Sequence, residues 1–524
     1  GITHAHGVML AIEGYVTHRT ERGETLRQAL IEDYLKSGEH CPAHWHGSFT
    51  VVIYHQGVTR IYTDQLASRA LFFVSDDAFV SDGAVYSSHS APLLAAMKHR
   101  AIDRSIDGAN LLQFMNKGRF FAGASLFKEL RQMPPGTGHR IVEDKTDQAP
   151  QIFTWYQYQL HNVDLQTEEV LPELKARLDR VILQYWQRAD APMMLLSGGV
   201  DSRYILNTLA ELLPRNEFEQ LYTCLWSEPD PAPDSDADWA KREAARHQIP
   251  FELLPIHAPN ESLFESLFLS QSGMTAQAFI QCNDLYHYRH LAQRGLRSLI
   301  RGDEIFGPNG PQVNTFEEAL AKAGLGYLGL GPSPILDGFD GKIDDWREAH
   351  TAHTKTLSQV ADAPNDVRDI LYCRERLPAL ITHLSAHRAP FVESFNPLLD
   401  PDILDLVSQL PSHMRTDKSI FRQCFARYYP TKGFATSGNA FDWQRLWHDR
   451  TLAGFIQQQL AQLPAPFNSA YWHKIGQLLS PGKVLSPGNE HHATTKVPIL
   501  QIACRAIVIG RWLTLYGAKA KITA

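Results

Sequence analysis

The fold is decided by the stretch Met193-Met-Leu-Leu-Ser-Gly-Gly-Val-Asp-Ser202. Its first four residues form an unbroken apolar run, which is typical of a strand that is buried on both faces. Apolar residues return at helical spacing over 201–213, so the sequence predicts a strand, a glycine-rich turn and a helix. In an open α/β sheet, ligands bind at turns of this kind.

Strands and helices alternate on both sides of this stretch. Apolar residues at helical spacing predict a helix over 170–186. After the stretch, the pattern predicts a strand at 220–226, a helix at 236–247 and a strand at 251–255. This alternation predicts a parallel sheet with helices on both faces. The rest of the chain is mostly helical in pattern, apart from a turn-rich insertion at 307–341.

The first 150 residues follow a different pattern. Alternating patterns and short apolar runs predict strands, and few segments have the spacing of a helix. We expect strands at 47–54, 59–63, 70–74 and 78–81, and helices at 24–34 and 107–116. A stretch rich in hairpins and poor in helices predicts antiparallel sheets. Because the chain becomes polar over 142–168, we place a domain boundary there and expect domains at 1–160 and 161–524.

The composition excludes several classes of protein. With 44% hydrophobic and 20% charged residues, the 524-residue chain is ordinary for a globular protein. The net charge is −7 and neither half is strongly basic, which argues against a nucleic-acid partner or a polybasic membrane surface. The six cysteines are scattered without a CxxC pair, as expected in a reducing compartment.

We expect neither a membrane span nor a signal peptide. We expect no apolar run near the ~18 residues that a bilayer requires. The most apolar stretch, 501–515, carries Arg505 and Arg511 and is interpreted as a helix. The expectation is a cytoplasmic enzyme of more than one domain, without membrane insertion.

The glycine-rich turn carries groups that suit a phosphate. Gly198 and Gly199 let the backbone approach an anion closely, and the helix that follows offers unpaired N–H groups and a partial positive charge. Ser197 and Ser202 add hydroxyl donors, and Asp201 can hold a divalent cation that bridges phosphates. The alternative is an ordinary strand–helix turn, which would not require the order Ser-Gly-Gly-x-Asp-Ser.

This hexapeptide, with Leu196 before it, resembles the pyrophosphate-binding loop of the ATP pyrophosphatases, and its surroundings resemble the asparagine synthetase superfamily. Three further segments follow in the family's order: Ile300-Arg-Gly-Asp-Glu-Ile-Phe-Gly307, Glu393-Ser-Phe-Asn-Pro-Leu-Leu-Asp400, and Lys418 to Phe434. The first is similar to a loop in which an aspartate binds magnesium, a role that the resemblance gives to Asp303, with Gly302 in the nucleotide site. The second departs from the family because Phe395 stands where arginine is usual.

The resemblance implies a reaction that uses ATP and Mg²⁺. A carboxylate attacks the α-phosphate, pyrophosphate leaves, and an amine captures the acyl-adenylate. Asp201 and Asp303 would bind the metal, and charge stabilisation would require a nearby lysine. Lys432 is the candidate, with a solvated surface lysine as the alternative. Lys418 and Arg422, one helical turn apart, would hold pyrophosphate or merely flank a helix.

The first domain resembles the family's glutaminase domain, but no N-terminal cysteine can be assigned as its nucleophile in the given sequence. The first cysteine is Cys41, so glutamine hydrolysis is not expected. Family members without that cysteine close a ring with an amine of the substrate. The implied fold is a degenerate glutaminase-like antiparallel β-sandwich followed by a doubly wound, parallel-sheet ATP pyrophosphatase domain with a helical extension. Ile300 stands where asparagine synthetases have Glu and β-lactam synthetases have Tyr, which counts against both chemistries.

The lasso peptide macrolactam cyclases are the most similar group. Three features are similar. They are the apolar run at 47–54 followed by the segment 79–82, the long insertion after Gly307, and the helical C-terminal region near residues 494–495. The implied substrate is a leaderless core peptide whose Asp or Glu side chain is adenylated and then attacked by the N-terminal amine. The implied partners are a leader peptidase and a leader-recognition protein. The base would be Glu304, Glu375 or Glu393, or the amine would arrive neutral.

Two other functions stay open. One is an asparagine synthetase- or β-lactam synthetase-like ligase that acts on a small molecule. The other is a non-catalytic scaffold of a biosynthetic complex. Histidine pairs such as His44 with His46 and His383 with His387 lack a third ligand in the sequence, so we expect no metal there. The GxGxxG match at 324–329 follows a helical segment rather than a strand and is interpreted as chance.

Overall fold

The computed structural model describes most of the chain. Lys432, the predicted strand at 78–81 and residues 494–495 lie outside the described residues. The described residues are 1–17, 21–74, 84–100, 102, 104–121, 123–143, 149–227, 230–257, 260–279, 281–307, 310–326, 336, 342–429, 433–435, 450–479, 499–516 and 521–523.

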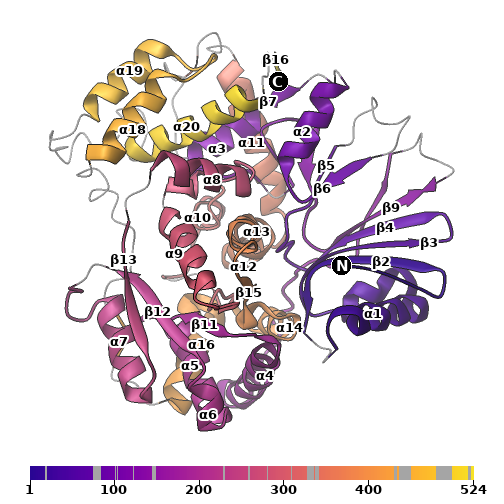
Figure 1. Ribbon diagram of the computed structural model, residues 1–524, viewed down its shortest axis with the longest axis vertical. Helices are drawn as coiled ribbons and strands as arrows, with labels where there is room; N and C mark the ends of the chain where they lie inside the picture. Colours follow the sequence, from indigo (N-terminus) through magenta and orange to yellow (C-terminus); the bar gives the residue numbers. More distant parts are fainter. Residues whose placement is uncertain are drawn as a thin grey trace.

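The N-terminal part is built from antiparallel sheets. A six-stranded sheet has the order β1-β2-β3-β4-β9-β10, and its strands are β1 (Ile2–Ala5), β2 (Val8–Val16), β3 (Gly47–His55), β4 (Val58–Thr63), β9 (Thr137–Val142) and β10 (Gln151–Thr154). A three-stranded sheet contains β6 (Val85–Ser87), β5 (Phe72–Val74) and β8 (Leu130–Gln132) in that order. Both lie to the right in Figure 1.

The six-stranded sheet buries both faces, which explains its alternating sequence. On β3, Val51 packs in a cluster with residues of α1 (Gly23–Ser37), whereas its neighbour Val52 packs with Phe73 of the three-stranded sheet. Successive side chains of a strand point to opposite faces, so one face meets a helix and the other a second sheet. The antiparallel part of the prediction is therefore confirmed, with strands near 47–54, 59–63 and 70–74.

The predicted helices in this region are confirmed as α1 and α3 (Gly108–Lys117), but α2 (Ser90–His99) was missed. Its buried apolar residues are Leu93, Leu94 and Met97. Three apolar positions in a helix of this length give too short a periodic pattern to stand out, and α2 is held by packing against the three-stranded sheet.

A five-stranded parallel sheet follows, in the order β13-β12-β11-β14-β15 (Figure 1, lower left). Its strands are β11 (Pro192–Leu195), β12 (Tyr222–Ser227), β13 (Phe251–Pro255), β14 (Ser298–Ile300) and β15 (Glu393–Phe395). The order reverses at β11, because β12 pairs on one side and β14 on the other. Carboxyl ends of strands on either side of such a reversal leave a crevice for a ligand.

Helices cover both faces of this sheet. Met193 packs in a cluster with α9 (Cys282–Gln293), and Met194 packs with α4 (Thr167–Arg188) and α5 (Val200–Leu212). The continuous apolar run that begins at Met193 therefore has a physical cause, since both faces of β11 are buried. With α7 (Asp236–His247), the elements predicted between 170 and 255 are confirmed.

The remaining helices come mainly from the C-terminal half, as expected. They are α6 (Arg215–Phe218), α8 (Glu261–Ser270), α10 (Phe316–Lys322), α11 (Lys342–Ser358), α12 (Pro364–Leu371), α13 (Leu377–Arg388), α14 (Pro401–Gln409), α15 (Ser412–Arg415), α16 (Ser419–Tyr428), α18 (Arg450–Ala461), α19 (Ser469–Leu478) and α20 (Ile499–Tyr516). Near the C-terminus, β16 (Lys521–Thr523) pairs in parallel with β7 (Ser105–Asp107). All six cysteines are buried and free.

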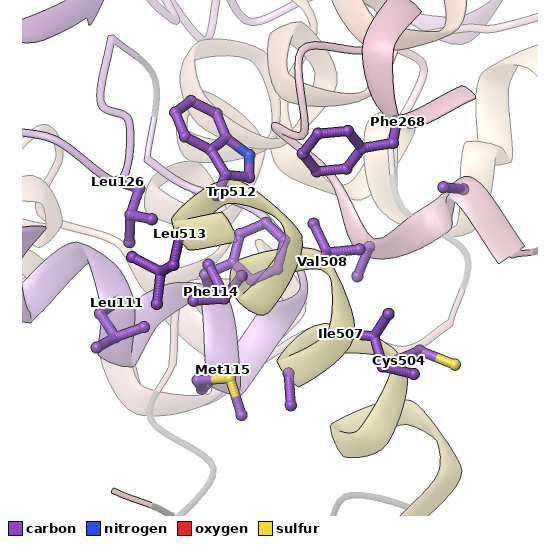
Figure 2. Close-up of a cluster of buried hydrophobic side chains, with 14 of the residues drawn as sticks. Leu111, Phe114, Met115, Leu126, Phe268, Cys504, Ile507, Val508, Trp512 and Leu513 are labelled. Atoms are coloured by element: carbon purple, nitrogen blue, oxygen red, sulfur yellow. The ribbon is translucent and has the colours of Figure 1, made fainter. Parts of the chain in front are cut away.

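The most apolar helix, α20, is part of the protein core. Its 18 residues are long and apolar enough to cross a membrane, with mean hydropathy 1.3, which corrects the expectation that no apolar run approaches that length. However, 72% of this helix is buried inside the protein. Figure 2 shows Trp512 and Leu513 beside Leu111, Phe114 and Leu126. This cluster joins 72–130 to 264–513, so one hydrophobic core crosses the predicted boundary at residue 160.

Replacing Trp512 by alanine tests the contribution of this core. The indole is fully buried, and its Nε1 donates a hydrogen bond of 2.9 Å to the carbonyl oxygen of Gly273. We expect Trp512→Ala to lower the free energy of unfolding by about 3–5 kcal/mol, measured by urea denaturation. The control Leu515→Ala, at a side chain that is 40% exposed, should change it by less than about 0.5 kcal/mol. Equal losses would contradict a core role for α20.

Candidate nucleotide site

The predicted glycine-rich loop lies at the carboxyl end of β11, where the sheet order reverses. The N–H of Ser197 donates to Ser202 Oγ at 3.0 Å, and the two hydroxyl oxygens are 3.0 Å apart. The N–H of Gly199 donates a longer bond of 3.3 Å to Ser197 Oγ. The side chain of Leu196 is fully buried and its N–H donates to the carbonyl of β12, so only its carbonyl remains for a ligand.

The two glycines of the loop have different tasks. The N–H of Gly198 donates to Asp236 Oδ1 at 2.8 Å, and a Cβ on Gly198 would lie 2.7 Å from Trp239 Cβ and 2.9 Å from Ala435 Cβ. A Cβ on Gly199 would meet only the Ser197 hydroxyl, at 3.3 Å. Gly198 therefore allows tight packing, whereas Gly199 leaves the backbone open for a ligand.

The second predicted motif meets the first by close backbone contact. Gly302 follows β14, and a Cβ there would lie 3.0 Å from both Asp201 Cβ and the Ser202 nitrogen. Real Cβ atoms essentially never approach closer, so glycine is the residue that fits without displacement. The structure thus brings together two segments that lie 100 residues apart in the sequence, as the parallel sheet predicts.

Lys418 forms an ion bridge between two carboxylates. Its Nζ lies 2.8 Å from Asp201 Oδ2 and 2.9 Å from Glu304 Oε1. Burial raises the pKa of Asp201 and raises that of Glu304 to about 7, although the ammonium opposes both shifts. The two carboxylates in turn raise the pKa of Lys418 against the effect of burial. The three side chains therefore form one coupled, mostly buried charge group.

The predicted magnesium ligand Asp303 also forms an ion pair with a cationic side chain of the protein. Arg301 binds it with both nitrogens, at 2.9 Å and 3.1 Å. Burial raises the pKa of Asp303, but the Arg301 guanidinium outweighs it and holds that pKa below its usual range. The charge of Asp303 acts on Asp201 and raises its pKa. Two such carboxylates suit Mg²⁺, which is commonly bound by one or two carboxylates together with substrate phosphates. The metal would compete with Lys418 and Arg301 for their oxygens.

Arg422 lies beside the same group. Its Nε donates to the carbonyl oxygen of Asp417 at 2.9 Å, and its charge lowers the pKa of Asp201. With the side chain 37% exposed, the guanidinium is accessible to a phosphate.

Glu393, which was predicted as a catalytic residue, does not join this group. Glu393 begins β15 and pairs in register with Ser298 rather than with Ile300, so it lies at the amino edge of the sheet. There it forms an ion pair with Arg69 of the antiparallel part, and the structure gives no support for Glu393 as a base. Lys432 lies outside the described residues. Three residues after it, the N–H of Ala435 donates to the Gly198 carbonyl oxygen at 3.4 Å.

The structure also assembles a polar cluster that sequence spacing did not suggest. His46 Nδ1 lies 3.0 Å from Asp400 Oδ1, and Asp402 completes a group whose ligand atoms lie within 4.8 Å of one another. His46 thus gains the acidic partners that the sequence placed more than 350 residues away. Arg180 Nη2 donates to Asp402 Oδ2 at 2.8 Å, so part of the acidic charge is already balanced.

A buried ion pair that we did not predict anchors the glycine-rich loop. Arg203 is the residue after the loop, and its Nη2 lies 3.1 Å from Glu243 Oε2 on α7. Burial raises the pKa of Glu243, but hydrogen bonds from His247 and Asn207 and the charges of Arg203 and Arg246 outweigh it and hold that pKa at about 2. The signal in the sequence was an arginine on the apolar face of a helix, where an unpaired charge would be costly.

Glu243→Gln should destabilise the protein in a pH-dependent manner. The lowered pKa means that ionised Glu243 stabilises the fold above pH 4.5 and that this contribution disappears as the pH falls towards 2. We expect the variant to lose about 3–5 kcal/mol of unfolding free energy at pH 7, measured by urea denaturation, and less at pH 3. The control Glu219→Gln removes a half-exposed partner of Arg215 and should change stability by less than about 1 kcal/mol. A pH-independent difference would contradict the assignment.

Comparison with known proteins assigns no family. No family model and no curated protein matches the chain. Among solved structures, it is similar to glutamine phosphoribosylpyrophosphate amidotransferase from B. subtilis complexed with ADP and GMP, with 12% identity over 59% of this chain and 64% of that chain. The structure of the allosteric regulatory enzyme of purine biosynthesis has 11% identity over 61% of this chain and 69% of that chain. The first match thus spans less than two thirds of its relative. Both TM-scores are 0.20, too low to assign a shared fold or function.

Proposed function

We propose that the protein is an ATP-dependent carbon–nitrogen ligase that forms AMP and pyrophosphate. Its substrate in this proposal is a leaderless core peptide, in which it joins an Asp or Glu side chain to the N-terminal amine as lasso peptide cyclases do. The observation that carries the proposal is the meeting of the 197–202 loop, the 302–304 segment and Lys418 at one edge of the parallel sheet. The choice of a peptide substrate rests on the resemblance in the sequence.

The residues of this edge match the charge changes of the proposed reaction. A carboxylate oxygen of the peptide attacks the α-phosphorus of ATP and the bond to pyrophosphate breaks. The amine then attacks the acyl carbon, and AMP and one proton leave. The loop at the start of α5 presents the hydroxyl groups of Ser197 and Ser202 to the phosphates, together with the N–H of Gly199, whose bond within the loop is long. Magnesium held by Asp201 and Asp303 would neutralise phosphate charge when bound.

Lys418 and Arg422 have a defined task in this proposal. Pyrophosphate gains negative charge as it leaves, and fixed cations in a partly buried site stabilise that charge. Lys418 contacts Asp201 directly, so its ammonium already lies beside the loop that would hold the phosphates. Arg422 lies on α16, one helical turn after Lys418, and its guanidinium adds a second cation.

Glu304 is the carboxylate that we propose as the proton acceptor for the amine. The buried side chain of Ile300 cannot accept a proton, and Glu393 lies at the other edge of the sheet. Glu304 Oε1 contacts Lys418, and its second oxygen accepts a hydrogen bond from the N–H of Phe306. These two contacts fix the orientation of the carboxylate beside Asp201.

The partners of this proposal follow from the substrate. A leaderless peptide requires a leader peptidase and a leader-recognition protein that act before cyclisation, and we propose that all three work in the cytoplasm. The two other hypotheses, a small-molecule ligase and a non-catalytic scaffold, lead to different products in the same assay.

Asp201→Asn should slow the reaction strongly while leaving the fold intact. The assay supplies ATP, Mg²⁺ and a leaderless candidate core peptide that carries an Asp or Glu side chain. We expect AMP and pyrophosphate in equal amounts, with the loss of one water from the peptide seen by mass spectrometry. Removal of this charge should slow AMP formation about 100-fold or more. The control Asp344→Asn changes an aspartate on α11 that is 68% exposed and should leave the rate unchanged.

The products distinguish the alternatives. ADP as the nucleotide product would overturn the adenylation mechanism. AMP formation with a small-molecule acid, but not with the peptide, would favour the small-molecule ligase. If the protein binds no ATP, the scaffold hypothesis remains.

A further inference from the structure

The turn that brings Lys418 to the nucleotide site has an uncommon backbone conformation. Asp417 has φ 54° and ψ 30°, and Lys418 has φ 55° and ψ 32°. Both residues lie in the left-handed region, which residues other than glycine, asparagine and aspartate seldom adopt. They follow one another between the end of α15 and the start of α16. Strained backbone of this kind persists only where the surrounding structure holds it, and it is frequent at functional sites.

The chain is held firmly just before this turn. Arg415, the last residue of α15, is buried, and its guanidinium donates to Asp369 Oδ2 at 2.8 Å and to Asp366 Oδ1 at 2.5 Å. A third bond of 2.8 Å goes to Asn162 Oδ1. These partners lie on α12 and in the segment before α4. The position at which the turn begins is therefore fixed.

The helix after the turn is held as well. The ring of Phe421 on α16 stacks on the ring of Phe306, with centroids 4.2 Å apart and an angle of 4° between the planes. Both side chains are fully buried. Phe306 belongs to the second motif, 300–307, so α16 packs against the segment that carries Asp303 and Glu304. With both ends fixed, the conformation of the turn decides how Lys418 enters the site.

The side chain of Asp417 stabilises the turn. Its Oδ1 accepts a hydrogen bond of 3.0 Å from the N–H of Gly310, which follows the second motif in the sequence. The backbone carbonyl oxygen of Asp417 accepts a bond of 2.9 Å from Arg422 Nε, and Arg422 Nη2 lies 3.8 Å from Asp417 Oδ1. Glycine would adopt the left-handed backbone without steric cost, but it would offer no side-chain acceptor to Gly310. Asp417 thus connects the turn, Arg422 and the chain after the second motif.

The turn determines where the two cations of α16 and its N-terminus lie. Lys418 is buried, and its Nζ contacts Asp201 and Glu304. If Asp417 took the φ of a right-handed helix, the chain after it would rotate by about 115° around the N–Cα bond. Because Lys418 and Arg422 both follow Asp417, this rotation would move both cations away from Asp201.

We propose that Asp417 is a positioning residue, which places Lys418 and Arg422 where they bind the leaving pyrophosphate. The proposal rests on the proposed function in one respect, namely that pyrophosphate is the group that these cations hold. Asp417 acts through the left-handed turn and through its bond to Gly310. Asparagine meets both requirements, because it tolerates the left-handed region and its side-chain oxygen accepts hydrogen bonds. A β-branched aliphatic residue meets neither.

The test measures the affinity of the full chain for inorganic pyrophosphate in magnesium chloride, by isothermal titration calorimetry without ATP or peptide. We expect Asp417→Val to weaken binding about tenfold or more, because charge-assisted hydrogen bonds to the phosphates are lost. Asp417→Asn should keep the affinity within about twofold of that of the unchanged protein. Arg422→Gln, at a partly exposed side chain, should also weaken binding about tenfold and so locate the probe beside α16.

Gln248→Val is the matched control. Gln248 follows α7 with φ 57° and ψ 41°, so valine there causes the same kind of backbone strain in another part of the molecule. Both valine variants should unfold at a lower urea concentration than the unchanged protein. Only Asp417→Val should lose affinity for pyrophosphate, which separates a positioning role from a general loss of stability.

Each outcome decides the proposal. It is overturned if Asp417→Val and Gln248→Val bind pyrophosphate equally well, or if Asp417→Asn binds as weakly as Asp417→Val. It is also overturned if the unchanged protein binds no pyrophosphate, or if Arg422→Gln leaves binding unchanged. If Asp417→Val does not fold by circular dichroism, Asp417→Ala replaces it, because alanine lacks the acceptor and is disfavoured in the left-handed region.

The two proposals can fail separately. If the variants bind pyrophosphate as expected but the unchanged protein forms no AMP in the ligase assay, the proposed function is rejected and the positioning role stands. If AMP forms but Asp417→Val binds pyrophosphate normally, the positioning role alone is rejected.

Discussion

The ion bridge of Lys418 to Asp201 and Glu304 fixes the point where three distant segments meet. Each carboxylate is largely buried, so neither could remain ionised there without a nearby cation. The bridge requires that β11 and β14 lie side by side and that α16 returns to their carboxyl ends. The close approach of Gly302 to Asp201 also depends on β11 and β14 lying side by side, because it brings the backbone after β14 against the loop after β11. The rest of the parallel sheet holds these pieces in register.

Internal cations are a recurring solution in this molecule. Lys418 forms ion pairs with Asp201 and Glu304, Arg301 forms one with Asp303, and Arg203 forms one with Glu243. Buried ion pairs contribute little net stability compared with apolar packing, but breaking one is costly. In each case the pair holds a specific loop in place. Arg119 and Arg505 depart from this pattern, because they donate hydrogen bonds to backbone carbonyl groups instead of forming ion pairs with carboxylates.

The two sequence halves share a core. α20 and the segment 264–285 pack against α2, α3 and the three-stranded sheet of the N-terminal part, and β16 pairs with β7. A second set of contacts joins the six-stranded sheet to β15, where Tyr15 donates a hydrogen bond of 2.9 Å to the Ser394 carbonyl oxygen. The antiparallel part is therefore bound to the parallel part on two sides.

The sequence by itself determined the local elements. The apolar run from Met193, the glycine-rich turn and the helical spacing after it predicted β11, the loop and α5, because strand and helix periodicity depend on neighbouring residues alone. The family order also predicted that Asp201, Gly302 and Lys418 would belong together, which the contacts support. Only the tertiary structure decided that Glu393 lies at the opposite edge of its strand and pairs with Arg69. It also brought Asp400 to His46 and gathered Lys117 with Arg505, since ion pairs and charge clusters depend on distances through space that spacing along the chain does not encode.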